Sequence, residues 1–141
     1  MEGGRDVRLE KAAAKLIAWE RVSRVGTVTE GGVPHVVPVC HILTGGKIYF
    51  GSGNNGRKVQ NLKANPRITV TVDLYSYDWA NLKGLMVQCT GKLIEKGARF
   101  RKIRALLFKK YPQYPAEAAL DEADSVIVEV APTRVFTWGM G

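Results

Sequence analysis

The sequence predicts one mainly β domain, in which six or seven antiparallel strands curl into a small barrel with helices at its flanks. Two observations carry this prediction. Short runs rich in β-branched residues outnumber helical patterns, and Gly-Gly pairs separate the early runs. Such pairs permit the positive φ angles of tight turns, so we expect neighbouring strands to join as hairpins. A chain of 141 residues that is 45% hydrophobic supports one core and is too short for two ordinary domains.

The first half of the chain is predicted to form a helix followed by three strands. Over residues 7–20, apolar side chains recur at helical spacing with basic side chains elsewhere on the wheel, which predicts an amphipathic helix. Three β-branched runs follow, separated by Gly31-Gly32 and Gly45-Gly46. We expect strands over residues 22–29, 33–42 and 47–50.

The second half is predicted to mix helices and strands. Residues 57–64 form a short helix that ends at Asn65-Pro66, because proline disfavours helix at the residue before it. Residues 96–111 have the pattern of a longer amphipathic helix, ended by Pro112. Between them, residues 75–83 form an aromatic and polar linker. The remaining strands are expected over 67–74, 85–94, 125–130 and 135–138.

A polar, glycine-rich loop at residues 51–56 leads into a helix start that carries two adjacent cations, Arg57 and Lys58. A helix N-terminus presents unpaired N–H groups and a partial positive charge, and glycines let the backbone approach an anion. Arg57 can grip phosphate oxygens with two parallel hydrogen bonds, while Lys58 adds a point charge and Ser52 a donor. The pattern predicts a phosphate site. A solvated basic helix start after an ordinary loop has the same pattern.

The histidines and cysteines indicate neither a metal site nor a hydrolytic one. His35 and His41 lie six residues apart in one predicted strand, on one face if no bulge intervenes. At about 3.3 Å per residue they are roughly 20 Å apart, too far to share a metal ion. His35 fits either a place beside a cofactor ring or a solvent-facing position. Cys40 and Cys89 lie in apolar runs without CxxC spacing, so we expect two buried thiols.

Basic residues dominate the composition. The formal net charge is +8 with a pI of about 9.7, and residues 92–110 hold eight basic side chains against Glu95. This excess fits a surface that binds nucleic acid or one that attracts a long anionic cofactor tail. The interpretation we favour is the solvated outer face of a helix. We do not expect nucleic acid as the partner. No apolar run has the length of a signal peptide or membrane span, so a cytoplasmic protein is expected.

Three ordered stretches resemble the pyridoxamine 5′-phosphate oxidase-like, FMN-binding split-barrel superfamily. They are GTVTEGGVPHVVPV at 26–39, IYFGS at 48–52 and GRKVQNLKANPRI at 56–68. Further on, VDLYSYDW at 72–79, Gly91-Lys92 and KYPQY at 110–114 are similar to a subgroup of deazaflavin (coenzyme F420)-dependent enzymes. The resemblance implies one split-barrel, flavin-binding domain over residues 1–141, with an N-terminal helix.

The resemblance also implies a cofactor site. The strand over residues 35–40 would line the flavin ring. Gly51 and Ser52 would flank the cofactor, and Arg57 and Lys58 would hold its phosphate. Where the oxidase begins its ring-lining strand with a cation, this sequence has His35. Where the oxidase has a glutamine that contacts the ring, this sequence has Met86, and Gln88 follows two residues later. The implied cofactor-binding residues are His35, Val36, Val37, Pro38, Val39, Cys40, Gly51, Ser52, Arg57, Lys58 and Gln88.

The function implied is that of an FMN-binding oxidoreductase in which a small substrate stacks on the flavin ring and exchanges a hydride or electrons with it. The cofactor carries such chemistry, so no catalytic dyad or triad is expected. The departures from the oxidase's pattern at His35 and Met86 argue against vitamin-B6 oxidation. The alternatives are a reductase that uses coenzyme F420 and a flavin- or nucleic-acid-binding protein without turnover. A homodimer with the cofactor at its interface is expected, while the substrate is not predicted.

Overall fold

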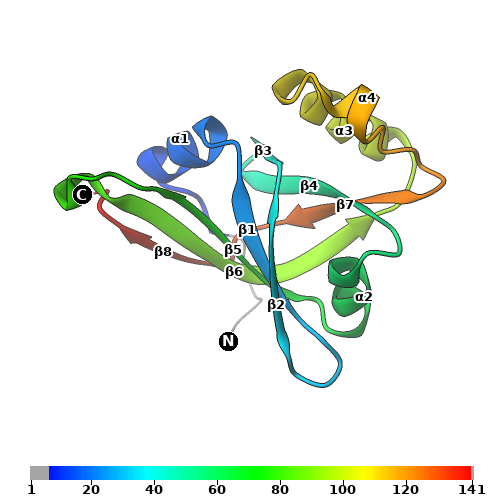
Figure 1. The fold of residues 1–141 in the computed structure, drawn as a ribbon, viewed down its shortest axis with the longest axis horizontal. Coiled ribbons are helices and arrows are strands. Elements are labelled where there is room, and N and C mark those ends of the chain that lie inside the picture. The colour runs from blue at the N-terminus through cyan, green and yellow to red at the C-terminus, as the bar shows by residue number, and fades with distance from the viewer. Residues whose placement is uncertain (1–6, 141) are drawn as a thin grey trace.

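A computed structural model of the protein describes residues 7–140 (Figure 1). It is a mainly β fold in which one antiparallel sheet curls into a split barrel with flanking helices. The strands follow the order β2-β1-β5-β6-β7-β4-β3, and β8 pairs with β6. Their bounds are β1 Ser23–Val28, β2 Pro34–Val39, β3 His41–Thr44, β4 Lys47–Gly53, β5 Arg67–Leu74, β6 Lys83–Ile94, β7 Ser125–Val130 and β8 Arg134–Trp138. The helices are α1 Lys11–Trp19, α2 Arg57–Ala64, α3 Ala98–Lys110 and α4 Tyr114–Glu117, with a 3-10 turn at Trp79–Asn81.

The long strand β6 makes the sheet curl. Its residues 83–90 pair with β5, and residues 84–88 also pair with β8 on the other side. From Gly91 to Ile94 it pairs with β7 instead. One strand therefore belongs to two groups of strands, and Figure 1 shows it curving from one group to the other.

The predicted strand over 33–42 is wrong as a single element. The chain breaks it at Cys40, because β2 pairs with β1 while β3 pairs with β4. Seven predicted strands thus become eight, and His35 and His41 lie on different strands. No glycine marks the break, so the local pattern contained no sign of it.

Other local predictions are confirmed. The helix over 57–64 and the strands over 67–74 and 125–130 have the predicted bounds. Both early hairpins form, with positive φ at Gly32, Gly45 and Gly46. Strand β4 extends beyond its prediction to Gly53, because Gly51–Gly53 pairs with β7. The sequence did not predict the turn at Trp79–Asn81 or α4.

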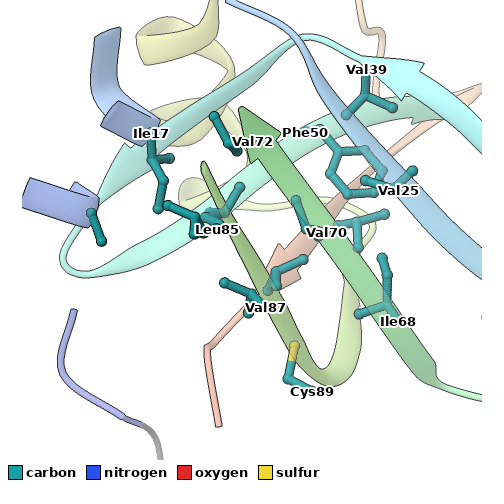
Figure 2. Packing of buried hydrophobic residues seen from close by; sticks show 14 of the residues in the cluster. Ile17, Val25, Val39, Phe50, Ile68, Val70, Val72, Leu85, Val87 and Cys89 are labelled. Atoms are coloured by element: carbon teal, nitrogen blue, oxygen red, sulfur yellow. The ribbon is translucent and has the colours of Figure 1, made fainter. Parts of the chain in front are cut away.

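Two apolar clusters hold the helices on the sheet. The first packs Leu16 and Ile17 of α1 against residues such as Val70, Leu85 and Val87 (Figure 2). The second packs one face of α3 against strands β3, β4 and β7, and its fully buried members include Phe100, Leu107 and Ile127. Burying such side chains contributes about 2 kcal/mol each, so the clusters fix both helices.

Side-chain burial corrects one prediction. Cys89 is buried as expected, but Cys40 is exposed because it occupies the break between β2 and β3. Over residues 7–140, no cluster of histidine, cysteine and acidic side chains has the makings of a metal site. In the same part of the chain, no helix has the length and apolar character needed to cross a membrane.

Candidate functional site

The N-terminus of α2 lacks a side-chain cap. The N-cap residue is Gly56, which has no side chain to bond to the first N–H groups, and the first turn contains no acidic residue. Arg57 and Lys58 occupy the first two helical positions. Cations here are unfavourable beside the positive end of the helix dipole. Both the unpaired N–H groups and the two cations therefore favour an anion at this end of α2.

Close packing shapes the loop before α2. The Gly56 N–H donates to the Gly53 carbonyl at 3.0 Å, and the Ser52 hydroxyl donates to the same oxygen at 3.1 Å. A Cβ at Gly56 would lie 3.1 Å from the Ser52 hydroxyl oxygen and 3.2 Å from the Gly53 carbonyl oxygen. Glycine therefore lets the loop fold back on the end of β4. This fold brings Ser52 beside the start of the helix.

Lys58 is the partly buried member of the cation pair, whereas Arg57 is exposed. Burial lowers the pKa of Lys58, because desolvation penalises the charged ammonium. An anion bound beside Lys58 would favour the charged form again.

His35 of β2 faces the same side of the sheet as α2. It is the cross-strand partner of Thr27, whose hydroxyl accepts a hydrogen bond from the Asn61 amide of α2 at 3.0 Å. The Nδ1 atom of His35 is buried and has no hydrogen-bond partner among residues 7–140. A buried polar atom of this kind costs free energy unless it is bonded. It is the kind of atom that a polar ligand group near α2 would satisfy.

The outer face of the sheet holds a separate hollow of about 520 Å³. One row of paired residues crosses it: Val36 pairs with Gly26, Gly26 with Thr69, and Thr69 with Gln88. Gly26 leaves a dip in this row, because a side chain is missing there. The hollow has the size of a small-molecule pocket. Its cationic lining residues are Arg24, Arg67 and Arg134.

The structure places six of the eleven predicted site residues at the start of α2 or in the outer hollow. Gly51, Ser52, Arg57 and Lys58 lie around the start of α2, while Val36 and Gln88 line the outer hollow. In β2 the burial alternates: His35 and Val37 are half-buried, Val36 and Pro38 are exposed, and Val39 is buried in the core. Cys40 lies close enough to Lys110 to affect its pKa.

Two of these residues have restricted roles. The side chain of Val39 packs in the core, so only its backbone can contact a ligand. A Cβ at Gly51 would lie 2.6 Å from the Leu120 side chain, so a glycine at this position lets Leu120 pack against β4. Met86 shares the outer face with Gln88, two residues along β6.

Sequence reasoning missed the arginines of the outer hollow. Arg24 comes from β1, Arg67 from β5 and Arg134 from β8, so only the pairing of the strands brings them together. The available signal was the polar alternation of Thr69 and Thr71 in a predicted strand. That signal indicates an exposed face but does not say which strands share it.

Half of the basic residues in the segment over 92–110 make contacts within the fold. Arg99 and Arg101 pair with Glu129 and Glu122 respectively. Arg104 donates to the Leu120 carbonyl oxygen at 3.1 Å, and Lys110 donates to a backbone carbonyl of the α1 end at 2.8 Å. Four of the eight basic residues thus stabilise the packing of α3. This supports the reading of the helix as a structural, partly solvated face.

The chain matches a known family over nearly its whole length. The family described as pyridoxamine 5′-phosphate oxidase matches residues 9–139. Among curated proteins, none matches the sequence significantly.

Solved structures share the fold at low sequence identity. A conserved hypothetical protein from Mycobacterium tuberculosis is 18% identical with a TM-score of 0.80, covering 98% of this chain and 89% of its own. A heme storage protein from Vibrio cholerae is 15% identical with a TM-score of 0.77, covering 92% and 94%. An F420 reductase is 22% identical with a TM-score of 0.73, covering 91% and 98%. At these identities the likeness establishes the fold.

Proposed function

Since the chain belongs to the pyridoxamine 5′-phosphate oxidase family, we propose that it is an FMN-dependent oxidoreductase. One observation carries the proposal: α2 begins without a cap or an acidic residue, and its first two side chains are cations. A terminal phosphate fits all three features, because it accepts hydrogen bonds and carries up to two negative charges.

The protein's own part is to bind and orient the cofactor. Lys58 and the N–H groups of the first turn of α2 would hold the phosphate, with Arg57 closing it from the solvent side. The unpartnered Nδ1 of His35 would bond a polar group of the cofactor. When bound, FMN supplies the hydride or electron transfer to a small substrate. No side chain is required as a nucleophile.

We propose further that the protein acts as a homodimer. The predicted site residues lie on two faces of the sheet: Lys58 and His35 on the side of α2, Val36 and Gln88 on the outer face. One cofactor can contact both sets if the outer hollow of one copy lies over the cofactor held by the other. The exposure of large apolar side chains supports this, because Val36 is 65% and Phe136 42% exposed on the outer face.

Coenzyme F420 is the second candidate cofactor. It too carries a phosphate that the start of α2 would hold, and an F420 reductase shares the fold. A heme storage protein shares it as well, so heme belongs in the same comparison. Titrating the three cofactors separately into cofactor-free protein and recording absorption spectra separates them. Preference for coenzyme F420 or heme would replace FMN, and binding of none would remove the proposed site.

Lys58→Ala is expected to weaken FMN binding by about 2 kcal/mol, roughly thirtyfold, because a charge-assisted contact is lost. Lys63→Ala is the matched control, since Lys63 is exposed in the last turn of the same helix. Quenching of flavin fluorescence on binding gives both affinities. Equal affinity of Lys58→Ala and the wild type would take Lys58 out of the site.

A further inference from the structure

A pocket of about 610 Å³ lies between the end of α1 and the end of α3, and it shares no lining residue with the start of α2 or the outer hollow. Two hydrogen bonds hold its walls together. Arg21 donates to the Lys110 carbonyl oxygen at 2.9 Å, and the Lys110 ammonium donates to the Glu20 carbonyl oxygen at 2.8 Å. The lining residues are Ala18, Trp19, Glu20, Arg21, Lys109 and Lys110.

Cations are crowded in this pocket. The charged groups of Arg21 and Lys110 both lie over the ring of Tyr111, at 5.4 Å and 5.3 Å from its centre. Within residues 7–140, neither forms an ion pair with a carboxylate. Burial and the nearby charge of Arg21 lower the pKa of Lys110 to about 8. With Lys109, three cations face the single carboxylate of Glu20, which leaves a balance of 3 − 1 = +2.

An exposed aromatic ring completes the pocket. Trp19 is the last residue of α1, and 79% of its surface is exposed. An indole ring in this position offers a flat face on which another ring can stack. A phosphomonoester carries a charge of about −2, which matches the excess of +2. The two requirements together define a ligand with a flat ring and a phosphate.

We propose that this pocket is a second binding site, for a phosphomonoester with an aromatic ring, of the mononucleotide type. Arg21, Lys109 and Lys110 hold the phosphate, and Trp19 stacks on the ring. The site does not depend on the proposed FMN site, because the two share no residue.

Adenosine 5′-monophosphate is the probe, with adenosine and inorganic phosphate as its separate halves, titrated into the wild-type protein by calorimetry. We expect the whole probe to bind at least tenfold more tightly than either half, since each half loses one contact. Near pH 8, binding is also expected to take up protons, because the phosphate raises the lowered pKa of Lys110. Two buffers of different ionisation enthalpy reveal that uptake.

Substitutions test whether adenosine 5′-monophosphate binds in this pocket. Trp19→Ala is expected to weaken it roughly tenfold and Lys109→Ala roughly fivefold, while Lys102→Ala, an exposed lysine elsewhere on α3, has no effect. Lys58→Ala is also expected to leave it unchanged. Absence of binding, or binding that Lys58→Ala abolishes and Trp19→Ala and Lys109→Ala do not alter, would overturn the proposal.

Discussion

Arg99→Met is expected to lower the free energy of unfolding by about 3 kcal/mol, because it leaves a buried carboxylate without its main cation. Glu129 of β7 is only 3% exposed. Its carboxylate accepts hydrogen bonds from Arg99 and from the Tyr49 hydroxyl, the latter at 3.0 Å. The Lys47 ammonium lies 4.0 Å away, too far for a direct hydrogen bond to the carboxylate. The cluster therefore ties α3 to β4 and β7.

Arg101→Met is the matched control, since it makes the same change two residues along α3. Its partner Glu122 is 31% exposed, and the two side chains are 3.4 Å apart. Water can solvate Glu122 after the change, so we expect a much smaller loss than for Arg99→Met. Urea unfolding of both variants gives the comparison. If the two variants lose similar free energies of unfolding, the burial of Glu129 does not determine the destabilisation by Arg99→Met.

Acid is expected to destabilise the protein through His41, by roughly 3 kcal/mol between pH 6.5 and pH 4. His41 is fully buried, and burial, aided by the charge of Lys110, lowers its pKa from 6.5 to about 4. Its Nε2 donates to the Ile17 carbonyl at 2.8 Å, while Nδ1 is buried and finds no hydrogen-bond partner in the described part of the chain. The unfolded chain binds the proton near pH 6.5 and the folded protein only near pH 4. Protons therefore favour unfolding between these values, and the full stability is present above pH 6.5.

His41→Gln is the control for this prediction, because the glutamine amide can still donate to Ile17 but does not titrate. Other acidic and basic groups titrate in both proteins, so the difference between the two unfolding curves isolates His41. We expect the difference in unfolding free energy to change by roughly 3 kcal/mol from pH 7 to pH 4. Parallel pH dependence in the two proteins would contradict the assignment.

The parts of the structure that the sequence predicted depend on local chemistry. Asn65-Pro66 ends α2, so that helix could be predicted with its bounds, and the Gly-Gly pairs predicted where the hairpins turn. The cation-bearing helix start at Arg57 and Lys58 is local in the same sense. The proposed phosphate site could therefore be found without knowledge of the fold.

The parts that could not be predicted depend on which strands pair. The break at Cys40 arises because the two halves of one β-branched run pair with different strands, and this also exposes the thiol. The outer hollow needs Val36, Gly26 and Gln88 in one row across the sheet, which only the register creates. The pocket between α1 and α3 likewise joins residues nearly ninety positions apart.

The central claim is that the start of α2 holds a cofactor by its phosphate. FMN and riboflavin differ only in that phosphate, so their affinities for the cofactor-free protein test the claim most directly. We expect FMN to bind about a hundredfold more tightly than riboflavin, and Lys58→Ala to remove most of this difference. Equal affinity of the wild-type protein for FMN and riboflavin would contradict it.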